Sequence, residues 1–335
     1  MGERAHEIAA LPPTPAAAPL VLEHLIVRWT RDARPLALLY QEGVAGGSET
    51  GADGTALWRD FWLEAAPRFG LTETEGRLLH LLFETEALYH LSTWSPALEA
   101  GALREICGHL GAVWLGAGPA PSRGALAHAE RTAGVINAGD IAPAAAKIAE
   151  AAATVIEERG VGGLTHRAVA AQAGVTAGAV THHFRTIQDL VAGAIRGQVL
   201  SLAKRTSAAL GPAASPLEGI ITVEEFAGTI RALVVDGRAG VRRIDRRGLF
   251  LAAIRRPEMA SSGAVIRFAH GATTRGALLQ MFKIEDPALT LHAGLLSRML
   301  STVALCCVNG TMSRETGALL VDEIIGRLAS AAERR

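Results

Sequence analysis

The chain has 335 residues, of which 49% are hydrophobic and 20% are charged, and its formal net charge is zero. This composition excludes a disordered chain, and the length suits two or three domains rather than one. Basic residues outnumber acidic ones by 7 to 4 in residues 141–205 and by 16 to 12 in residues 206–335, whereas residues 1–140 hold 10 basic against 17 acidic residues. The acidic N-terminal third is therefore not expected to contact nucleic acid.

Neither the cysteines nor the apolar runs indicate secretion or membrane insertion. Cys107, Cys306 and Cys307 make no disulfide framework and have no metal-ligand spacing with histidine. Glu23 and His24 interrupt the only candidate signal sequence, and no uncharged apolar run reaches the roughly 18 residues that span a bilayer. We therefore expect a cytoplasmic protein with no metal site and no membrane partner.

Residues 1–115 have helical periodicity, with alternating β patterns scarce. They concentrate aromatic and histidine side chains, namely Tyr40, Trp58, Trp62, His80, Phe83, Tyr89, His90 and Trp94. Such a set can line a ligand pocket or fill a core, and the sequence leaves both open. Residues 116–140 follow, and their GAGPAPSRG segment predicts a flexible linker.

Three closely spaced helices with clear start and stop signals are predicted in residues 141–205. The first covers Ile141–Glu158, carries an apolar stripe and stops at a glycine. Thr165 is placed to cap the second, because its hydroxyl can accept a hydrogen bond from a free amide of the first turn. Gly174 ends that helix, since glycine accepts the left-handed conformation, and Thr176 caps the third helix two residues later.

The last two of these helices share a small core and leave one face free. The predicted core residues are Val169, Ala173, Val175, Val180 and Phe184. The free face carries Ala177, Gly178, Thr181, His182 and His183. These small or hydrogen-bonding groups can approach base edges and phosphates in a major groove. A capped helical hairpin alone is weak evidence, but the preceding helix makes the pattern a helix-turn-helix.

A resemblance to the TetR family of one-component transcription regulators covers about fifty residues, AAKIAEAAATVIEERGVGGLTHRAVAAQAGVTAGAVTHHFRTIQDL. It implies a double-stranded DNA operator as partner, with Thr165 and Thr176 on phosphates and Arg167 on a base or a phosphate. The other residues of the implied DNA-binding set are His166, Ala177, Gly178, Thr181, His182, His183 and Arg185.

Two positions depart from the family's pattern. Thr181 stands where members often carry a tyrosine in the recognition helix, and Ile187 stands where a lysine often opens the fourth helix. Both replaced side chains usually hold the DNA backbone, so their loss removes salt-dependent affinity and leaves the specificity contacts. We expect weaker DNA binding than is usual in the family, with His183 and Arg185 as partial substitutes.

Residues 206–335 are predicted to form a helical ligand-binding and dimerisation domain. The expected helices are Val223–Val235, Arg242–Ile254, Ser262–Phe282, Pro287–Val308 and Arg314–Ala331. In the TetR family the last two long helices form a dimer bundle, and the apolar faces of Leu295–Cys307 and Leu319–Leu328 suit that role. They suit a core within one chain equally well. The expected fold class is all-α, a three-helix helix-turn-helix domain plus helical bundles.

The resemblance also implies a small, largely apolar effector inside the helical domain. Candidate ligand-binding residues are Phe268, His270, Arg275, Met281, Phe282, His292 and Met299. The plainer alternative is that most of them are core residues, because methionine and phenylalanine at helical spacing usually pack.

An internal repeat links the two ends of the chain. Gly76–Leu110 aligns with Gly294–Leu328, and both segments contain a Gly-Ala-Leu run and end on similar residues. Further matches are Arg34, Leu36 and Leu38 with Arg247, Leu249 and Leu251, and Glu105 and Ile106 with Glu323 and Ile324. We interpret residues 1–115 as a copy of the regulatory domain without a helix-turn-helix; chance similarity of two alanine- and leucine-rich segments is the alternative.

Such a duplication allows two assemblies. The copies can pair within one chain as a pseudo-dimer, which leaves one DNA-reading unit. Alternatively, residues 206–335 can form a homodimer that presents two units to half-sites about 34 Å apart. The sequence does not choose between them.

No enzymatic motif is present. Phosphate-binding loops of the Walker type, HExxH, a nucleophile elbow and di-iron ExxH pairs are absent, so no catalytic residue and no cofactor are expected. His182 and His183 point about 100° apart on a helix and do not chelate one metal. The sequence favours a transcription regulator, a repressor released by a small ligand. The alternative is an interaction or ligand-sequestering protein whose helix-turn-helix has decayed, as Thr181 and Ile187 suggest.

Overall fold

The computed structural model describes residues 13–118, 124–137, 142–195, 197, 220, 222–236, 246–282 and 287–333. Every regular element in these ranges is a helix, so the predicted all-α class is confirmed. The α-helices are α2 (Ala17–Arg31), α3 (Arg34–Ala45), α4 (Glu49–Ala65), α5 (Glu73–Tyr89), α6 (Pro96–Trp114), α7 (Ala125–Asn137), α8 (Pro143–Arg159), α9 (His166–Ala173), α10 (Ala177–His183), α12 (Val223–Arg231), α13 (Arg246–Ile254), α14 (Ala260–Phe268), α15 (Ala272–Phe282), α16 (Pro287–Val308) and α17 (Arg314–Glu333).

Local capping explains several of the helix starts. Thr72 and Glu75 form a capping box at the start of α5, where Thr72 Oγ1 accepts from the Glu75 amide and Glu75 Oε2 accepts from the Thr72 amide. The α3–α4 hairpin depends on close backbone approach, because a Cβ on Gly51 would lie 2.3 Å from the carbonyl carbon of Gly43.

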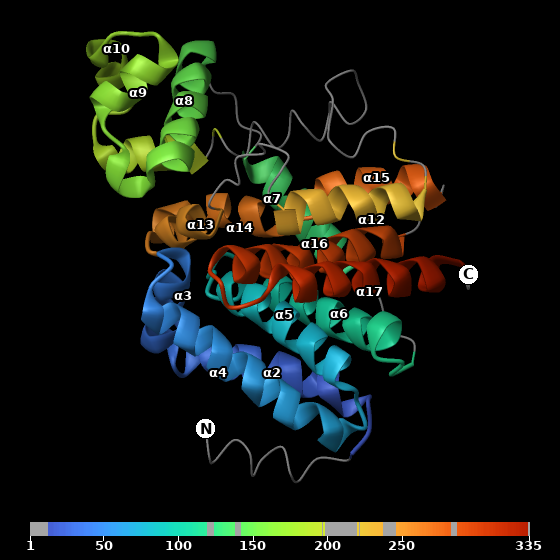
Figure 1. Cartoon of the computed structure of the whole chain (residues 1–335). Coiled ribbons are helices and arrows are strands. Elements are labelled where there is room, and N and C mark those ends of the chain that lie inside the picture. The colour runs from blue at the N-terminus through green and yellow to red at the C-terminus, as the bar shows by residue number, and fades with distance from the viewer. Residues whose placement is uncertain are drawn as a thin grey trace.

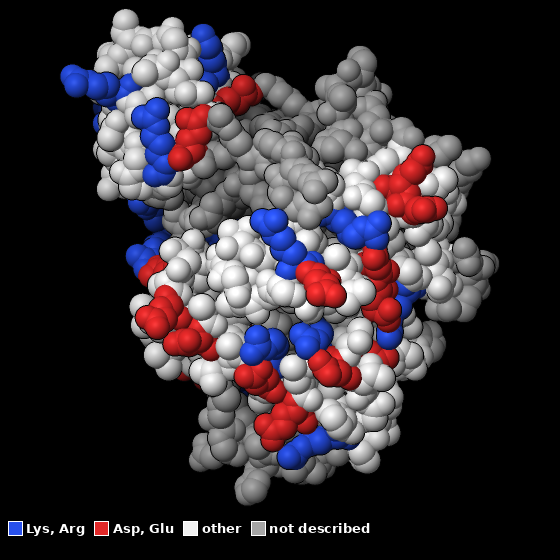
Figure 2. Space-filling view, viewed as in Figure 1, with Lys and Arg blue, Asp and Glu red and all other residues white. Residues whose placement is uncertain are grey.

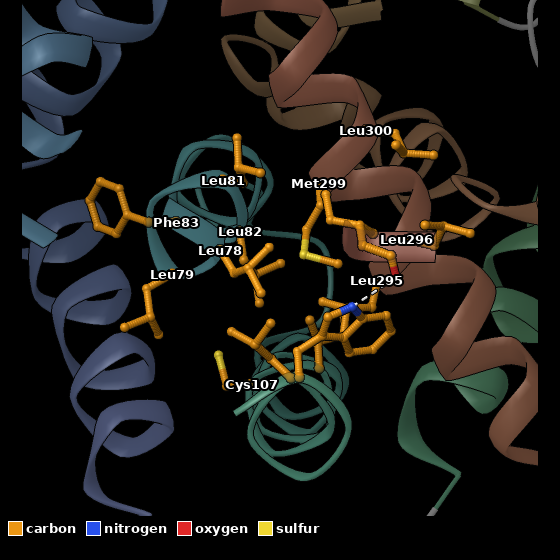
Figure 3. Close-up of a cluster of buried hydrophobic side chains, with 14 of the residues drawn as sticks. Leu78, Leu79, Leu81, Leu82, Phe83, Cys107, Leu295, Leu296, Met299 and Leu300 are labelled. Atoms are coloured by element: carbon orange, nitrogen blue, oxygen red, sulfur yellow. Dashed lines mark hydrogen bonds between the residues drawn. The ribbon is translucent and has the colours of Figure 1, made fainter. Parts of the chain in front are cut away.

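Helices α2–α7 and α12–α17, here called the body, pack in layers (Figure 1). α5 and α6 pack against α16 and α17 in the middle, with α2–α4 outside the first pair and α12–α15 outside the second. Leu78 and Leu82 of α5 face Leu295 and Met299 of α16, and all four are fully buried (Figure 3). The helices predicted as two regulatory domains therefore contribute to one continuous hydrophobic core.

The predicted helix over Ser262–Phe282 is wrong, because the structure has two helices there, α14 and α15. Gly271 lies in the break with φ of +121°, and a Cβ on it would lie 2.9 Å from the carbonyl oxygen of Ala293 in α16. The break between α14 and α15 therefore lies where the chain passes close to the backbone of α16. Such a tertiary contact is not visible in the helical periodicity of the sequence.

The predicted linker at 116–140 also differs from the structure. It contains α7, whose Leu126, Ala129 and Ala133 are buried against the body. These small and apolar side chains are spaced on one helical face. Their spacing favours a helix, although the glycine and proline that precede it predict a linker.

The other predicted helices of the C-terminal region match closely. α16 has the predicted bounds, and α17 ends two residues later than expected. α12 continues as a π-helical segment, Ala232–Asp236, over the end of the range predicted from Val223. α13 begins at Arg246, and the preceding residues 242–245 of its predicted range lie outside the described part of the chain.

Helices α8–α10, here called the head, form a separate unit at one end of the body (Figure 1). Its core contains Ile148, Ala152 and Val155 of α8 with residues of α9 and α10. The same apolar cluster continues to Phe250 and Leu251 of α13. The head is therefore attached to the body through α13 as well as through the chain.

Candidate nucleic-acid interface and effector site

The caps predicted for the two helices of the helix-turn-helix are confirmed. Thr165 Oγ1 accepts from the Ala168 amide and Thr176 Oγ1 accepts from the Ala179 amide, each at 3.1 Å. Gly174 ends α9 in the left-handed conformation with φ of +64°. In both caps the threonine oxygen is the acceptor, so each hydroxyl keeps its proton for a further acceptor such as a phosphate oxygen.

The predicted small core of the head is also present. Val169, Ala173 and Val180 are buried, and Val175 and Phe184 are partly buried against them. His166, predicted to lie at the DNA, has a structural partner instead. Its Nε2 lies 2.7 Å from the carbonyl oxygen of Phe184, which can only accept, so this nitrogen carries the proton and ties the start of α9 to the end of α10.

The remaining predicted contact residues lie together on an exposed face, here called the docking face. They are Thr165, Arg167, Thr176, Ala177, Gly178, Thr181, His182, His183 and Arg185. α10 lies at the outer edge of the head, away from the body (Figure 1). Lysine and arginine side chains project from the head at the upper left of Figure 2. Gly178 has no close packing neighbour in the described chain, since a Cβ on it would meet nothing closer than Thr176 Oγ1 at 3.8 Å.

The next helix runs over 187–195 and begins where the resemblance implied that a fourth helix opens, but sequence reasoning missed its cap. Thr186 and Asp189 cap it reciprocally, with the Thr186 amide donating to Asp189 Oδ2 at 2.8 Å and the Asp189 amide donating to Thr186 Oγ1 at 3.0 Å. These backbone and side-chain bonds from Thr186 hold the pKa of Asp189 below its usual value. The capping spacing of Thr186 and Asp189 was the available signal. The start of this helix therefore presents the exposed carboxylate of Asp189 and the exposed Ile187, and Ile187 stands where the family often has a lysine.

One sequence comparison identifies the head. Residues 148–194, which are α8 from its sixth residue to the helix after α10, match the bacterial regulatory proteins of the tetR family. The chain carries the helix-turn-helix domain of the TetR family. That family consists of regulators rather than enzymes.

Several solved structures are similar to this chain. A TetR family member from Streptomyces coelicolor A3 is 27% identical, with 55% of this chain and 98% of that chain covered and a TM-score of 0.35. A transcriptional regulator from Rhodococcus sp. Rha1 is 25% identical, with 55% and 95% covered and a TM-score of 0.37. Multidrug binding protein EbrR complexed with malachite green is 30% identical, with 54% and 95% covered and a TM-score of 0.33. No curated protein sequence matches the chain.

Three of the seven predicted effector residues line one hollow. Phe268, His270 and Arg275 lie there with Leu126, Glu130, Gly271, Ala272, Thr290, Ala293 and Gly294. Arg275 Nη1 lies 2.7 Å from Glu130 Oε2 and 3.3 Å from Thr290 Oγ1, so it joins α15 to α7 and α16. His270 is held between the hydroxyl groups of Tyr89 at 2.7 Å and Ser301 at 2.9 Å.

The other four effector candidates are not at this hollow. Met299 is fully buried against α5, and His292 faces His109 with 3.1 Å between Nδ1 and Nε2. Met281 and Phe282 pack, partly buried, against the main core. The plainer reading, that such residues are core, holds for Met299 in particular.

The aromatic set of the N-terminal region fills a core. Trp58 makes ring contacts with Trp29, Phe61 and Phe83, and Trp62 is fully buried. Within the described residues, no group of three or more histidine, cysteine or acidic side chains is placed to hold a metal ion. One described helix, Ala288–Val308, is long and apolar enough to cross a membrane, but 78% of its most apolar window is buried in the fold, as in a core helix.

Proposed function

We propose that this chain binds operator DNA through the docking face and regulates transcription in the cytoplasm. The observation that carries the proposal is the exposed face of α10, together with the threonine caps that open α9 and α10 and whose hydroxyl protons are available. The threonine hydroxyls and Arg167 would donate hydrogen bonds to backbone phosphates of the DNA. Gly178 would let the α10 backbone approach the base edges.

Selection of the purified chain against random and genomic DNA, followed by footprinting, tests this proposal. Recovery of a defined sequence whose binding weakens steeply from low to moderate salt would support it. Recovery of no sequence, with only salt-sensitive background, would favour the runner-up, an interaction or ligand-sequestering protein with a decayed head. The alternative rests on Thr181 and Ile187, which replace residues that usually hold the DNA backbone, and on the exposed carboxylate of Asp189.

We further propose that the chain is a repressor whose DNA binding is released by a small ligand at the hollow beside α7. The hollow has a volume of about 10 Å³, room for one water molecule, so a ligand there has to displace the Glu130–Arg275 pair. It contacts Leu126 and Glu130 of α7, and α8 of the head begins six residues after α7 ends. A ligand that replaces the Glu130–Arg275 pair would shift α7 and, through it, the population of head orientations that fit an operator.

Substitution of Arg275 separates ligand response from DNA reading. Arg275→Ala should retain operator affinity and lose release by any compound that releases the unaltered chain. Arg231→Ala is a matched control, because Arg231 pairs with Asp322 on another part of the body. Equal release from all three proteins would exclude the hollow as the effector site.

We also propose that residues 1–115 and 206–335 are copies of one regulatory domain. α6 and α17 begin at Pro96 and Arg314, 218 positions apart, and α5 and α16 end at Tyr89 and Val308, 219 positions apart. The matched Glu105 and Glu323 have the same spacing of 218. An alignment without gaps therefore fits these two pairs of helices better than the gapped alignment that the Gly-Ala-Leu runs suggest.

A further inference from the structure

Helices that correspond in the two copies also touch each other. α5 packs on α16, α6 on α17 and α3 on α13 (Figure 1). Packing of each element on its own counterpart is the mark of an isologous interface, in which the same surface is used from both sides. In a homodimer the two surfaces belong to two subunits, whereas here they belong to one chain.

The surface where α5 and α6 meet α16 and α17 is here called the seam. Individual contacts across the seam occur in reciprocal pairs. Thr85 Oγ1 lies 3.0 Å from the carbonyl oxygen of Arg298, and Thr302 Oγ1 lies 2.8 Å from that of Leu81. The two hydroxyl oxygens are 2.8 Å apart, where α5 and α16 cross. With the spacing of 218, Thr302 corresponds to the residue next to Thr85, so this crossing lies at the pseudo-twofold axis.

A second reciprocal pair lies farther from the axis. His109 of α6 meets His292 of α16, and Arg327 of α17 meets Glu75 of α5 at 3.0 Å. Arg327 corresponds to His109 at the spacing of 218, and Glu75 is next to the position that corresponds to His292. The geometry is therefore that of a dimer interface, with different side chains on its two sides.

The charges of the seam make the two copies complementary rather than interchangeable. Glu86 of the first copy binds Arg298 and lies 3.2 Å from Arg267, and all three side chains are fully buried. Burial alone would raise the pKa of Glu86, but Arg298 and Arg267 hold that pKa below its usual value. The position that corresponds to Glu86 in the second copy is Ala304.

A homodimer through α16 and α17 would remove this carboxylate from the interface. Ala304 of a partner would replace Glu86, and Arg298 and Arg267 of each subunit would be buried without a counter-charge. Buried charges that lose their partner are strongly destabilising. The second copy is therefore adapted to the first copy and not to another copy of itself.

We propose that residues 1–115 take the place of the second subunit, so that the chain is a self-contained pseudo-dimer with a single head that reads one half-site as one chain. The part that concerns DNA rests on the proposed function, whereas the pairing of the copies does not. Binding of one half-site also limits the phosphate contacts available, which agrees with the modest basic charge of the head.

Mass and thermal unfolding of the full chain test the pairing. Light scattering should give the mass of one chain, and the unfolding midpoint should not depend on protein concentration. Glu86→Gln should lower that midpoint by roughly 5 to 10 °C at every concentration. Glu73→Gln, which breaks the exposed pair with Arg77 on the same helix, is the control and should have little effect. A two-chain mass with a midpoint that rises with concentration would overturn the proposal.

A cysteine pair locates the seam without depending on stability. Thr85→Cys and Thr302→Cys, in a chain whose Cys107, Cys306 and Cys307 are replaced by alanine, should form a disulfide that migrates as one chain on a non-reducing gel. A disulfide-linked pair of chains would show that the seam forms between chains and would overturn the proposal. A one-chain particle that binds no DNA would leave the pairing intact and overturn only the proposed function.

Discussion

Gly178 is the residue at which folding and DNA reading make opposite demands. Its backbone is helical and a Cβ would meet only Thr176 Oγ1, at an ordinary van der Waals distance of 3.8 Å, so the fold does not require glycine. Gly178→Ala should stabilise the head by up to about 1 kcal/mol, because alanine is the better helix former. The same methyl group would project from the docking face, and we expect roughly ten-fold weaker operator binding by fluorescence anisotropy.

Gly326 provides the matched control for this substitution. It is also helical, exposed and unobstructed, but it lies on α17 in the body. Gly326→Ala should stabilise the chain without any change in DNA affinity. Unchanged or tighter operator binding by Gly178→Ala would contradict the assignment of the docking face.

Arg167 tests the electrostatic part of the same face. Arg167→Ala should weaken operator binding about ten-fold and make the salt dependence shallower by about one counterion, because a phosphate contact is lost. Arg68→Ala, an exposed arginine of the body, is the control. Equal affinity and equal salt slopes for both variants would show that Arg167 does not face DNA.

At the scale of elements, the sequence predicts those helices whose ends are decided locally. Thr165, Gly174 and Thr176 set the bounds of the helix-turn-helix through bonds to residues three or four positions away, which a sequence reading can recognise. The break at Gly271 was missed because the backbone of α16 imposes it. The bond from His166 to Phe184 was not predicted for a similar reason, since this partner is reached only after α9 and α10 have crossed.

The break between α14 and α15 leads to a stability prediction. Gly271→Ala should lower the free energy of unfolding by about 2 kcal/mol or more, because it adds backbone strain and a clash with Ala293. Gly310→Ala has a positive φ of +72° but open space around it, so it should cost only about 1 kcal/mol. Equal losses in chemical denaturation would show that α16 does not crowd the break.

At the scale of the whole molecule, the repeat was visible in the sequence but the pairing of its copies was not. The similarity between α5–α6 and α16–α17, which we interpret as a duplication, does not show whether the two copies meet. The ion pairs of Glu86 with Arg298 and Arg267 join the two copies. These residues come from helices that are far apart in the sequence. The α7 side of the hollow, Leu126 and Glu130, escaped prediction because α7 lies in the range expected to be a linker.

Buried histidines predict how the stability of the body depends on pH. Burial lowers the pKa of His80 to about 3 and that of His90 to about 4, from an ordinary value of 6.5. The unfolded chain therefore binds more protons below pH 6.5, and stability falls as the pH drops from 6.5 towards 4, by on the order of 2 kcal/mol per histidine at pH 5. His90→Gln should remove about half of the loss between pH 7 and 5 in urea denaturation. An identical pH profile for the variant would contradict the burial of a neutral His90.

The central claim is that one chain reads one half-site with the face of α10. Footprinting of the selected operator, combined with native mass spectrometry of the complex, tests it most directly. We predict one protected half-site and one chain per DNA, with protection that needs about ten-fold more protein in Gly178→Ala and is unchanged in Gly326→Ala. Two protected half-sites bound by two chains would contradict the single-headed pseudo-dimer, and the absence of any specific protection would contradict DNA reading itself.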